Sequence, residues 1–266
     1  MKRTLLIVAL LCASSFAAVK GDGSTGSFIG GNGTSGCINC FNAVTSYTVF
    51  FYYKAPAVPN TTNVQAVTLI CPEVCSVPDI EFDWNHTTAA QEDACVKATD
   101  YNPANIAPVS ANTWYAITCT WDGSHVKSYK NGVQVTSVSS TATSTNKVLP
   151  AAFVNATPNG SLAEFAFWDN VVCTPNQILA MSKGVRPTLA CPNASTYYTF
   201  WATNASTSTN EPDLSGCLSA ASCQGNNASH PATGQYNASG SPGFSGFTIV
   251  NHAPVTPFSR EEEAGQ

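Results

Sequence analysis

The stretch WYAITCTWDGSHVKSYKNGV, residues 114–133, decides how the rest of the chain is interpreted. Residues 114–121 and 126–129 look like two strands around a turn at Asp122-Gly123, because both runs contain aromatic and β-branched residues. Asp122-Gly123 and Asn131-Gly132 supply residues that tolerate positive φ at tight turns. Asn-Gly between apolar runs is a strong hairpin signal. The stretch therefore predicts consecutive antiparallel strands joined by short turns.

Similar runs stand on both sides of this stretch, at 47–53, 64–70, 78–84 and 163–168. Each is apolar or alternating and ends at Pro, Gly or Asn, which indicates a short strand. Further strands are expected at 197–201 and 247–250. One segment favours a helix, residues 175–183, because Thr174 can cap it, proline opens it and Gly184 can end it. Many short strands and a single helix predict an all-β sandwich.

Residues 114–133 resemble the concanavalin A-like, laminin G-like jelly-roll family. Its members repeatedly show a Trp, a strand that ends in a Trp-Asp-Gly turn, and then Tyr-X-Asn-Gly. The run Phe165 to Asn170 and the helix with 184–187 behind it resemble the closing strand and helix of that family. The resemblance covers residues 44–187 and implies a concanavalin A-like jelly-roll sandwich. The fold class that we expect is therefore an all-β concanavalin A-like jelly-roll sandwich with one short helix, followed by a C-terminal extension whose cysteines make it disulfide-rich. It leaves function open, since this sandwich carries lectins, adhesion modules, glycosidases and structural repeats.

The start of the chain has the features of a secretory signal peptide. Lys2 and Arg3 precede a short apolar run that ends at Cys12, and Ser15 and Ala17 are small residues near the expected cleavage point. The run is shorter than the roughly 20 residues that cross a membrane. We therefore expect a secreted, extracellular protein without a membrane span.

Composition divides the chain into five expected segments. They are a signal peptide at 1–18, a Gly/Ser-rich arm at 19–43, the LamG-like sandwich at 44–187, a Cys/Asn-rich extension packed on it at 188–256, and an acidic disordered tail at 257–266. The arm contains one apolar pair, Phe28-Ile29, which could add as a strand to the sheet edge of a neighbouring copy.

Ten cysteines follow the signal peptide, and an even number in an oxidising compartment predicts five disulfides. Cys217 with Cys223 is the most plausible local pair, and Cys173 with Cys191 is the next. Zinc binding is the competing interpretation for two closely spaced pairs, Cys37 with Cys40 and Cys71 with Cys75, although no histidine stands at ligand spacing beside them. The ten are Cys37, Cys40, Cys71, Cys75, Cys95, Cys119, Cys173, Cys191, Cys217 and Cys223.

Nine Asn-X-Ser/Thr sequons make the chain a candidate for heavy N-glycosylation. Charged residues are only 10% of the chain, where about 25% is ordinary, so attached sugar would hydrate a surface that lacks charge. The net charge of −5 and the absence of a basic patch argue against nucleic acid. The acceptors would be Asn32, Asn60, Asn85, Asn155, Asn159, Asn193, Asn204, Asn227 and Asn237.

One acidic constellation, Asp79, Glu81 and Asp83, alternates along a predicted strand, so its members share a face. Carboxylates can hold calcium, which the resemblance permits, and Asp122 is a weaker candidate ligand. The β-glucanase branch of the family uses two Glu flanking an Asp, and here the order is Asp-Glu-Asp. No nucleophile motif or phosphate loop is present, so no catalytic residue is expected.

Together these features favour a non-enzymatic structural glycoprotein, a self-assembling subunit of an extracellular coat, matrix or filament. The alternative is a carbohydrate-binding, lectin-like module for which calcium is a candidate cofactor, and a glycoside hydrolase is the remote third. The expected partners are further copies of the chain or extracellular glycans.

Overall fold

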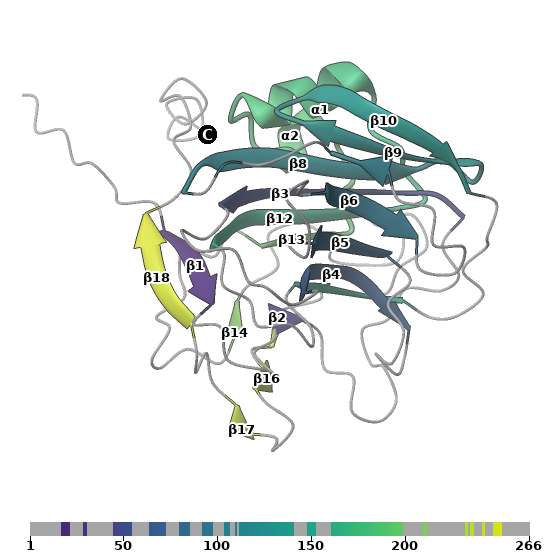
Figure 1. Ribbon diagram of the computed structural model, residues 1–266. Coiled ribbons are helices and arrows are strands. Elements are labelled where there is room, and N and C mark those ends of the chain that lie inside the picture. The colour runs from purple at the N-terminus through teal and green to yellow at the C-terminus, as the bar shows by residue number, and fades with distance from the viewer. Residues whose placement is uncertain are drawn as a thin grey trace, which may run out of the picture.

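The structure is a computed structural model that describes residues 17–21, 29–30, 45–54, 64–72, 80–85, 92–97, 104–106, 110, 112–140, 148–152, 161–198, 210–211, 232–233, 235–236, 241–242 and 247–251. Side chains are described at 45–54, 95, 106, 110, 112–140, 161–195 and 197. The described chain is built from antiparallel strands in two large sheets, with two short helices lying over one of them (Figure 1).

The first sheet has the strand order β10-β9-β8-β3-β12-β1-β18, and β13 also pairs with β12. Every described pairing in it is antiparallel, as expected for strands joined by hairpins and long crossovers. Its strands are β1 (Ala17–Gly21), β3 (Tyr47–Lys54), β8 (Trp114–Trp121), β9 (His125–Lys130), β10 (Val133–Ser139), β12 (Ser161–Asp169), β13 (Thr196–Tyr198) and β18 (Phe247–Asn251).

The second sheet has the order β14-β15-β2-β11-β4-β5-β6-β7, and a separate ribbon pairs β16 with β17. Its strands are β2 (Ile29–Gly30), β4 (Val64–Pro72), β5 (Ile80–Asn85), β6 (Glu92–Lys97), β7 (Ala104–Asn105), β11 (Val148–Ala152), β14 (Asn210–Glu211) and β15 (Ala232–Thr233). The ribbon consists of β16 (Gln235–Tyr236) and β17 (Ser241–Pro242).

β3 lies in the middle of the first sheet and is buried on both faces. Phe50 and Tyr52 belong to the cluster under the helices. The alternate residues, Val49 and Phe51, are also fully buried, and Val49 is in register with Cys119 on the opposite face. This double burial explains why the run YTVFFYYK is continuously apolar and aromatic rather than alternating.

A buried disulfide between Cys95 of β6 and Cys119 of β8 connects the two sheets, with a Cα–Cα distance of 5.7 Å. Both cysteines are fully buried. Because the bond spans the interior, it identifies the inner face of each sheet, and the alternation of strand residues then identifies the outer face.

The helices cover the outer face of the first sheet (Figure 1). α1 (Pro175–Ser182) begins with a capping box in which Thr174 accepts a hydrogen bond from the backbone N–H of Gln177 and donates its own N–H to that side chain. Its buried residues, Ile178 and Met181, pack on the sheet. α2 (Pro187–Ala190) follows directly.

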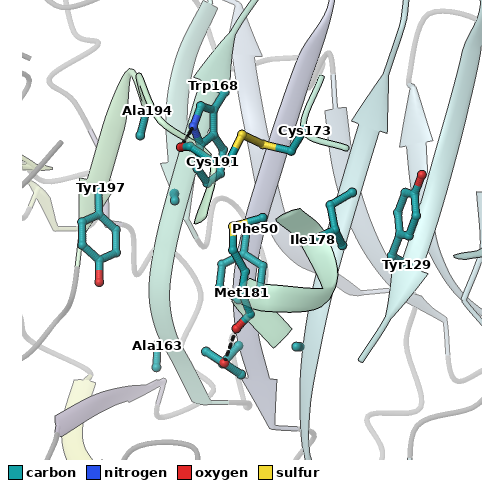
Figure 2. Packing of buried hydrophobic residues seen from close by; sticks show 13 residues of the cluster. Phe50, Tyr129, Ala163, Trp168, Cys173, Ile178, Met181, Cys191, Ala194 and Tyr197 are labelled. Atoms are coloured by element: carbon teal, nitrogen blue, oxygen red, sulfur yellow. Dashed lines mark hydrogen bonds between the residues drawn. A yellow bond between two sulfur atoms is a disulfide. The ribbon is translucent and has the colours of Figure 1, made fainter. Parts of the chain in front are cut away.

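Three buried contacts hold this face together (Figure 2). The Cys173–Cys191 disulfide closes the segment that contains both helices. The indole Nε1–H of Trp168 donates to the carbonyl of Cys191 at 2.8 Å. The hydroxyl of Tyr52 donates to the carbonyl of Met181 at 2.8 Å.

The observed elements agree with the expected sandwich and include a helix and several short strands that the sequence analysis did not expect. A second helix, α2, is present because proline at its first turn and the disulfide at its end favour one helical turn. β1 spans the expected boundary between the signal peptide and the arm, and β2 lies within the expected arm. Both join the sheets, since Val19 is in register with Leu162 and Ile29 with Ala152. Among the described residues, no helix has the length and apolar character needed to cross a membrane.

Candidate functional site

The two outer faces of the sandwich offer different surfaces. The helices and the cluster of Trp168, Met181 and Tyr52 occupy the outer face of the first sheet. α1 lies beside β8 and β10 (Figure 1). The Cys95–Cys119 disulfide places β6 against the other face of the first sheet, away from the helices. No described helix packs on the outer face of β4, β5 and β6, so we take that face as the candidate site.

The register between β5 and β6 places the acidic constellation. Phe82 of β5 pairs with Cys95 of β6, and Cys95 belongs to the inner face because it is disulfide-bonded to β8. Residues that pair directly across antiparallel strands share a face. Phe82 therefore takes an inner position, and its neighbours Glu81 and Asp83 take positions on the outer face. Asp79, the third predicted member, lies outside the described residues.

The positions beside these two acids hold two polar residues on β4 and two apolar residues on β6. Glu81 pairs with Thr68 of β4 and Val96 of β6, and Asp83 pairs with Gln65 and Ala94. At the end of the strands, Asn85 pairs with Glu92. We call the outer face of β4, β5 and β6 the candidate face. Its positions are Gln65, Thr68, Glu81, Asp83, Asn85, Glu92, Ala94 and Val96.

Carboxylate and amide positions of this kind can act in two ways. Carboxylate and amide oxygens accept hydrogen bonds from hydroxyl groups, and the same oxygens are the ligands that calcium takes. Glu81 and Asp83 stand two residues apart on one face, about 7 Å along the strand. That spacing allows both acids to meet one ligand. Their donor chemistry fits calcium, but only two of the three predicted acids belong to the described structure.

Asp122, the weaker calcium candidate, serves the β8–β9 turn instead. Its Oδ1 accepts hydrogen bonds from the backbone N–H of Ser124 and of His125, and its Oδ2 receives the ammonium of Lys127 at 2.7 Å. Burial raises the pKa of this carboxyl, but the hydrogen bonds from Lys127, Ser124 and His125 outweigh burial and hold its pKa well below the usual range. Both oxygens are thus engaged, which argues against a metal there. Among the described residues, no cluster of three or more His, Cys, Asp or Glu could hold a metal ion.

Four of the predicted disulfide cysteines are paired in the described structure. The expected Cys173–Cys191 bond is present, and Cys95 pairs with Cys119, a partnership that the sequence left open. Cys71 lies on β4, in register with Leu149. The remaining cysteines, Cys37, Cys40, Cys75, Cys217 and Cys223, lie outside the described residues.

The predicted glycan acceptors and the assembly arm are placed only in part. Asn85 ends β5, and Asn193 is an exposed residue between α2 and β13. The other sequon asparagines lie outside the described residues. Ile29 of the arm pairs with Ala152 of the same chain, and Phe28 is not described.

Two features of the candidate face, β6 and its pairing with β5, were missed by the sequence analysis. The run EDACVK is short and its three apolar residues are consecutive, so it lacks the alternation of apolar and polar residues that indicates a strand. The acidic run at 80–85 was visible, but its face assignment depends on the Cys95–Cys119 disulfide. The spacing of the cysteines in the sequence does not predict this pairing, because it depends on how β6 and β8 pack in the folded protein.

A family model described as concanavalin A-like lectin/glucanases superfamily matches residues 30–179. No curated protein sequence matches the chain.

Solved structures share the fold at low sequence identity. One is a protein from Bacteroides ovatus provisionally described as carbohydrate binding, with 15% identity, a TM-score of 0.55 and coverage of 91% of this chain. The chain spans 61% of the length of that protein.

Two further structures are less similar. One is a heptameric SAP-like pentraxin from Limulus polyphemus, at 11% identity and a TM-score of 0.49, covering 65% of this chain and 86% of its own. The other is domain 4 of an extracellular GH43 arabinanase from Geobacillus stearothermophilus in complex with arabinotriose, at 16% identity and a TM-score of 0.42, covering 62% and 87%.

Proposed function

We propose that this chain, which belongs to the concanavalin A-like lectin/glucanases superfamily, is a carbohydrate-binding module that takes its ligand on the candidate face. The observation that carries the proposal is the contrast between the two outer faces. One is closed by α1 and α2, and the other has acidic and amide positions at Gln65, Glu81 and Asp83 in adjacent strands.

The chemistry of this face favours neutral sugars. Sugar hydroxyls donate to carboxylates and accept from amide and hydroxyl groups, and Glu81, Asp83, Gln65 and Thr68 are groups of these types. The net charge of −5 and the two acids disfavour sialylated or sulfated glycans. We therefore expect neutral hexose-containing glycans as ligands of the metal-free protein.

Calcium dependence forms part of this proposal. The two acids, with Asp79, supply the hard oxygen donors that calcium takes. Bound calcium would offset the acidic charge of the face. A chelator is therefore expected to change both the affinity and the preference for neutral over acidic glycans.

Binding without bond cleavage is proposed because the acids follow the order Asp-Glu-Asp, which departs from the Glu-Asp-Glu order of the β-glucanase branch. A retaining glycosidase needs two carboxyl groups about 5 Å apart. Turnover of β-glucans that disappears in Glu81→Gln would replace this proposal with hydrolysis.

A glycan array probed with the full chain, with and without chelator, tests the proposal. We expect reproducible binding to one class of neutral glycan, and a loss of at least tenfold in the double variant Glu81→Gln, Asp83→Asn. The control is Asp122→Asn, which removes one negative charge at a turn away from the candidate face and should keep the affinity. An array without binding, or a double variant that binds as well as the parent, would refute the proposal.

Self-assembly into a coat, matrix or filament is the second candidate. The edge strand β10 favours it, because Val133 and Val135 are exposed and the strand VQVTSVS has no charge or proline, the residues that usually protect an edge. The irregularity between Gln134 and Thr136 opposes continuous pairing. Light scattering of the parent and of Val135→Lys decides between a monomer and an assembly that depends on this edge.

A further inference from the structure

In the sequon Asn193-Ala194-Ser195, the asparagine is exposed to solvent and the serine is buried. Asn193 is exposed, with φ of 64°, a conformation that asparagine tolerates better than most residues. Ala194 is 2% exposed and Ser195 is 1% exposed. This is the sequon whose three residues the structure describes in full.

Ser195 is bound into the first sheet. Its Oγ accepts a hydrogen bond at 2.9 Å from the buried backbone N–H of Asp169. Its own N–H donates to the carbonyl of Phe167 at 2.7 Å. The next residue, Thr196, begins β13 and pairs with Phe167. Withdrawing the hydroxyl from this place would leave a buried donor without its partner, which a folded protein resists.

The segment is also anchored on its N-terminal side. Cys191, two residues before Asn193, is disulfide-bonded to Cys173 and accepts the hydrogen bond from Trp168. Figure 2 shows Ala194 beside Trp168 and the disulfide, and Tyr197 further along the same segment. Both ends of the sequon are thus held by the fold, so it cannot leave the sheet as a free loop.

N-glycan transfer requires Ser or Thr at the third position because the transferring enzyme recognises that hydroxyl as well as the asparagine. From the exposed amide and the buried hydroxyl, we propose that Asn193 is a glycan acceptor only before the Cys173–Cys191 loop closes and β13 docks. In this step Asn193 Nδ2 forms a bond to the anomeric carbon of an oligosaccharide and loses a proton. The polyprenyl diphosphate that carried the sugar departs.

The proposal has a consequence for where sugar lies. Asn193 follows α2, on the helix-covered side of the sandwich, so its glycan would occupy the side opposite the candidate face. Once attached, the sugar does not disturb the hydrogen bonds of Ser195, because the asparagine itself faces solvent. The folded protein can therefore carry a glycan on Asn193 but is not a substrate for its transfer. Glycosylation at this site must precede folding.

The test compares two forms of the full chain produced in an oxidising compartment that lacks N-glycosylation. One form is folded and oxidised, and the other is reduced and alkylated so that it stays unfolded. Each is incubated with purified oligosaccharyltransferase and a polyprenyl-diphosphate-linked oligosaccharide, and occupancy at Asn193 is measured by peptide mass spectrometry. We expect transfer to Asn193 at least tenfold faster in the alkylated form. A smaller ratio, or no transfer in the alkylated form, would overturn the proposal.

Val133→Thr provides a matched control within the same fold. It completes a new sequon that begins at Asn131 and has Gly132 in the middle, and its asparagine is exposed with φ of 52°. The third position is 64% exposed, against 1% for Ser195. In the folded variant we expect transfer to Asn131 and none to Asn193. The Oδ1 of Asn131 accepts a hydrogen bond from the N–H of Ala116 at 3.0 Å, so the informative result is the comparison of the two sites in the folded variant. Detectable and equal transfer at Asn131 and Asn193 would show that burial of the hydroxyl does not prevent transfer, and would also overturn the proposal.

A second arm uses secreting cells. A reductant added during the labelling pulse delays closure of the Cys173–Cys191 loop, and occupancy at Asn193 should rise while the reductant is present. Asn193→Gln identifies the band that belongs to this glycan and keeps the hydrogen bonds of Ser195. Unchanged or lower occupancy under reductant would contradict the proposed order of events.

Discussion

The first and second sheets are both antiparallel and share one interior, but their outer faces differ. Trp168, Phe50 and Tyr52 of the first sheet are buried beneath α1. In the second sheet, the outer positions of β5 are acidic and no described helix lies over them. The same sandwich thus uses one outer face as a second core, whereas the other has acidic and amide positions in adjacent strands. The stability of the domain and its proposed ligand should therefore depend on different residues.

The largest expected effect comes from removing the centre of the helix-covered face. Trp168 is fully buried and donates to Cys191. Trp168→Ala should lower the free energy of unfolding by about 3–5 kcal/mol, because a large cavity and an unpaired carbonyl remain. Denaturant titration measures this loss.

Trp168→Phe is the control for the ring, since it keeps most of the volume and loses only the hydrogen bond, at about 1–2 kcal/mol. Glycan affinity of both folded variants should equal that of the parent. A large loss of affinity in fully folded Trp168→Phe would show that the two faces are not independent.

The next effect comes from the disulfide between the sheets. Replacing Cys95 and Cys119 by Ala should cost about 3 kcal/mol of stability, because a disulfide closing a loop of this length restricts the unfolded chain. Glycan affinity should also fall, since Cys95 holds β6, a strand of the candidate face, against β8.

Replacing Cys173 and Cys191 by Ala is the matched control. Their sequence separation is 18 and that of the first pair is 24, so the cost in stability should be similar. This second pair lies on the helix-covered face and should leave affinity intact. Equal losses of glycan affinity in the two double variants would contradict the claim that ligand binding depends on the candidate face and not on the helix-covered face.

Substitutions at two turn glycines distinguish the cost of backbone strain from the cost of a steric clash with α1. Both have positive φ, Gly132 at 82° and Gly123 at 88°. A Cβ on Gly132 would stand 2.8 Å from the Cα of Leu179 in α1, whereas on Gly123 it would meet the carbonyl oxygen of Thr45 at 3.2 Å. Gly123→Ala should cost about 1–2 kcal/mol for the left-handed backbone, and Gly132→Ala more, about 2–3 kcal/mol, because α1 must also shift. Thermal unfolding of both variants measures the difference, and equal costs would show that α1 yields freely.

The smallest effect concerns the β8–β9 turn and depends on pH. The pKa of Asp122 is lowered in the folded protein, so its charge stabilises the fold above the ordinary aspartate pKa, and this contribution is lost as pH falls toward the folded pKa. Asp122→Asn should cost about 0.5–1 kcal/mol at neutral pH.

The difference between the Asp122→Asn variant and the parent should stay constant from neutral pH to about pH 5 and shrink below about pH 4. Unfolding midpoints across this range measure it. A difference that grows on acidification would contradict the assigned role of the carboxylate.

Local features of this chain were predictable because they depend on residues close in sequence. Asn131-Gly132 makes the predicted hairpin turn, with φ of 52° and 82°. Thr174 and Pro175 begin α1 as expected. The expected bond between Cys173 and Cys191 joins neighbours of a short helical segment.

Features that depend on distant residues were not predictable. Glu164 stands in an apolar run and was expected to lie in a regular strand. The structure buries it at a register shift between Ala163 and Ala166, with φ of 51°. The pairing with β3 creates that bulge, and no feature of β12 itself indicates it.

The sequence by itself determined the central strands β3, β8, β9 and β12, the turns between β8, β9 and β10, the helix cap and the alternation of acids in β5, because these follow from short-range sterics and from the two-residue period of a strand. Tertiary structure alone decided which face those acids occupy, which cysteine crosses between the sheets, and that Ser195 is buried beside an exposed Asn193. These outcomes require segments far apart in the chain to meet, and the energy of such contacts is not encoded in any one segment.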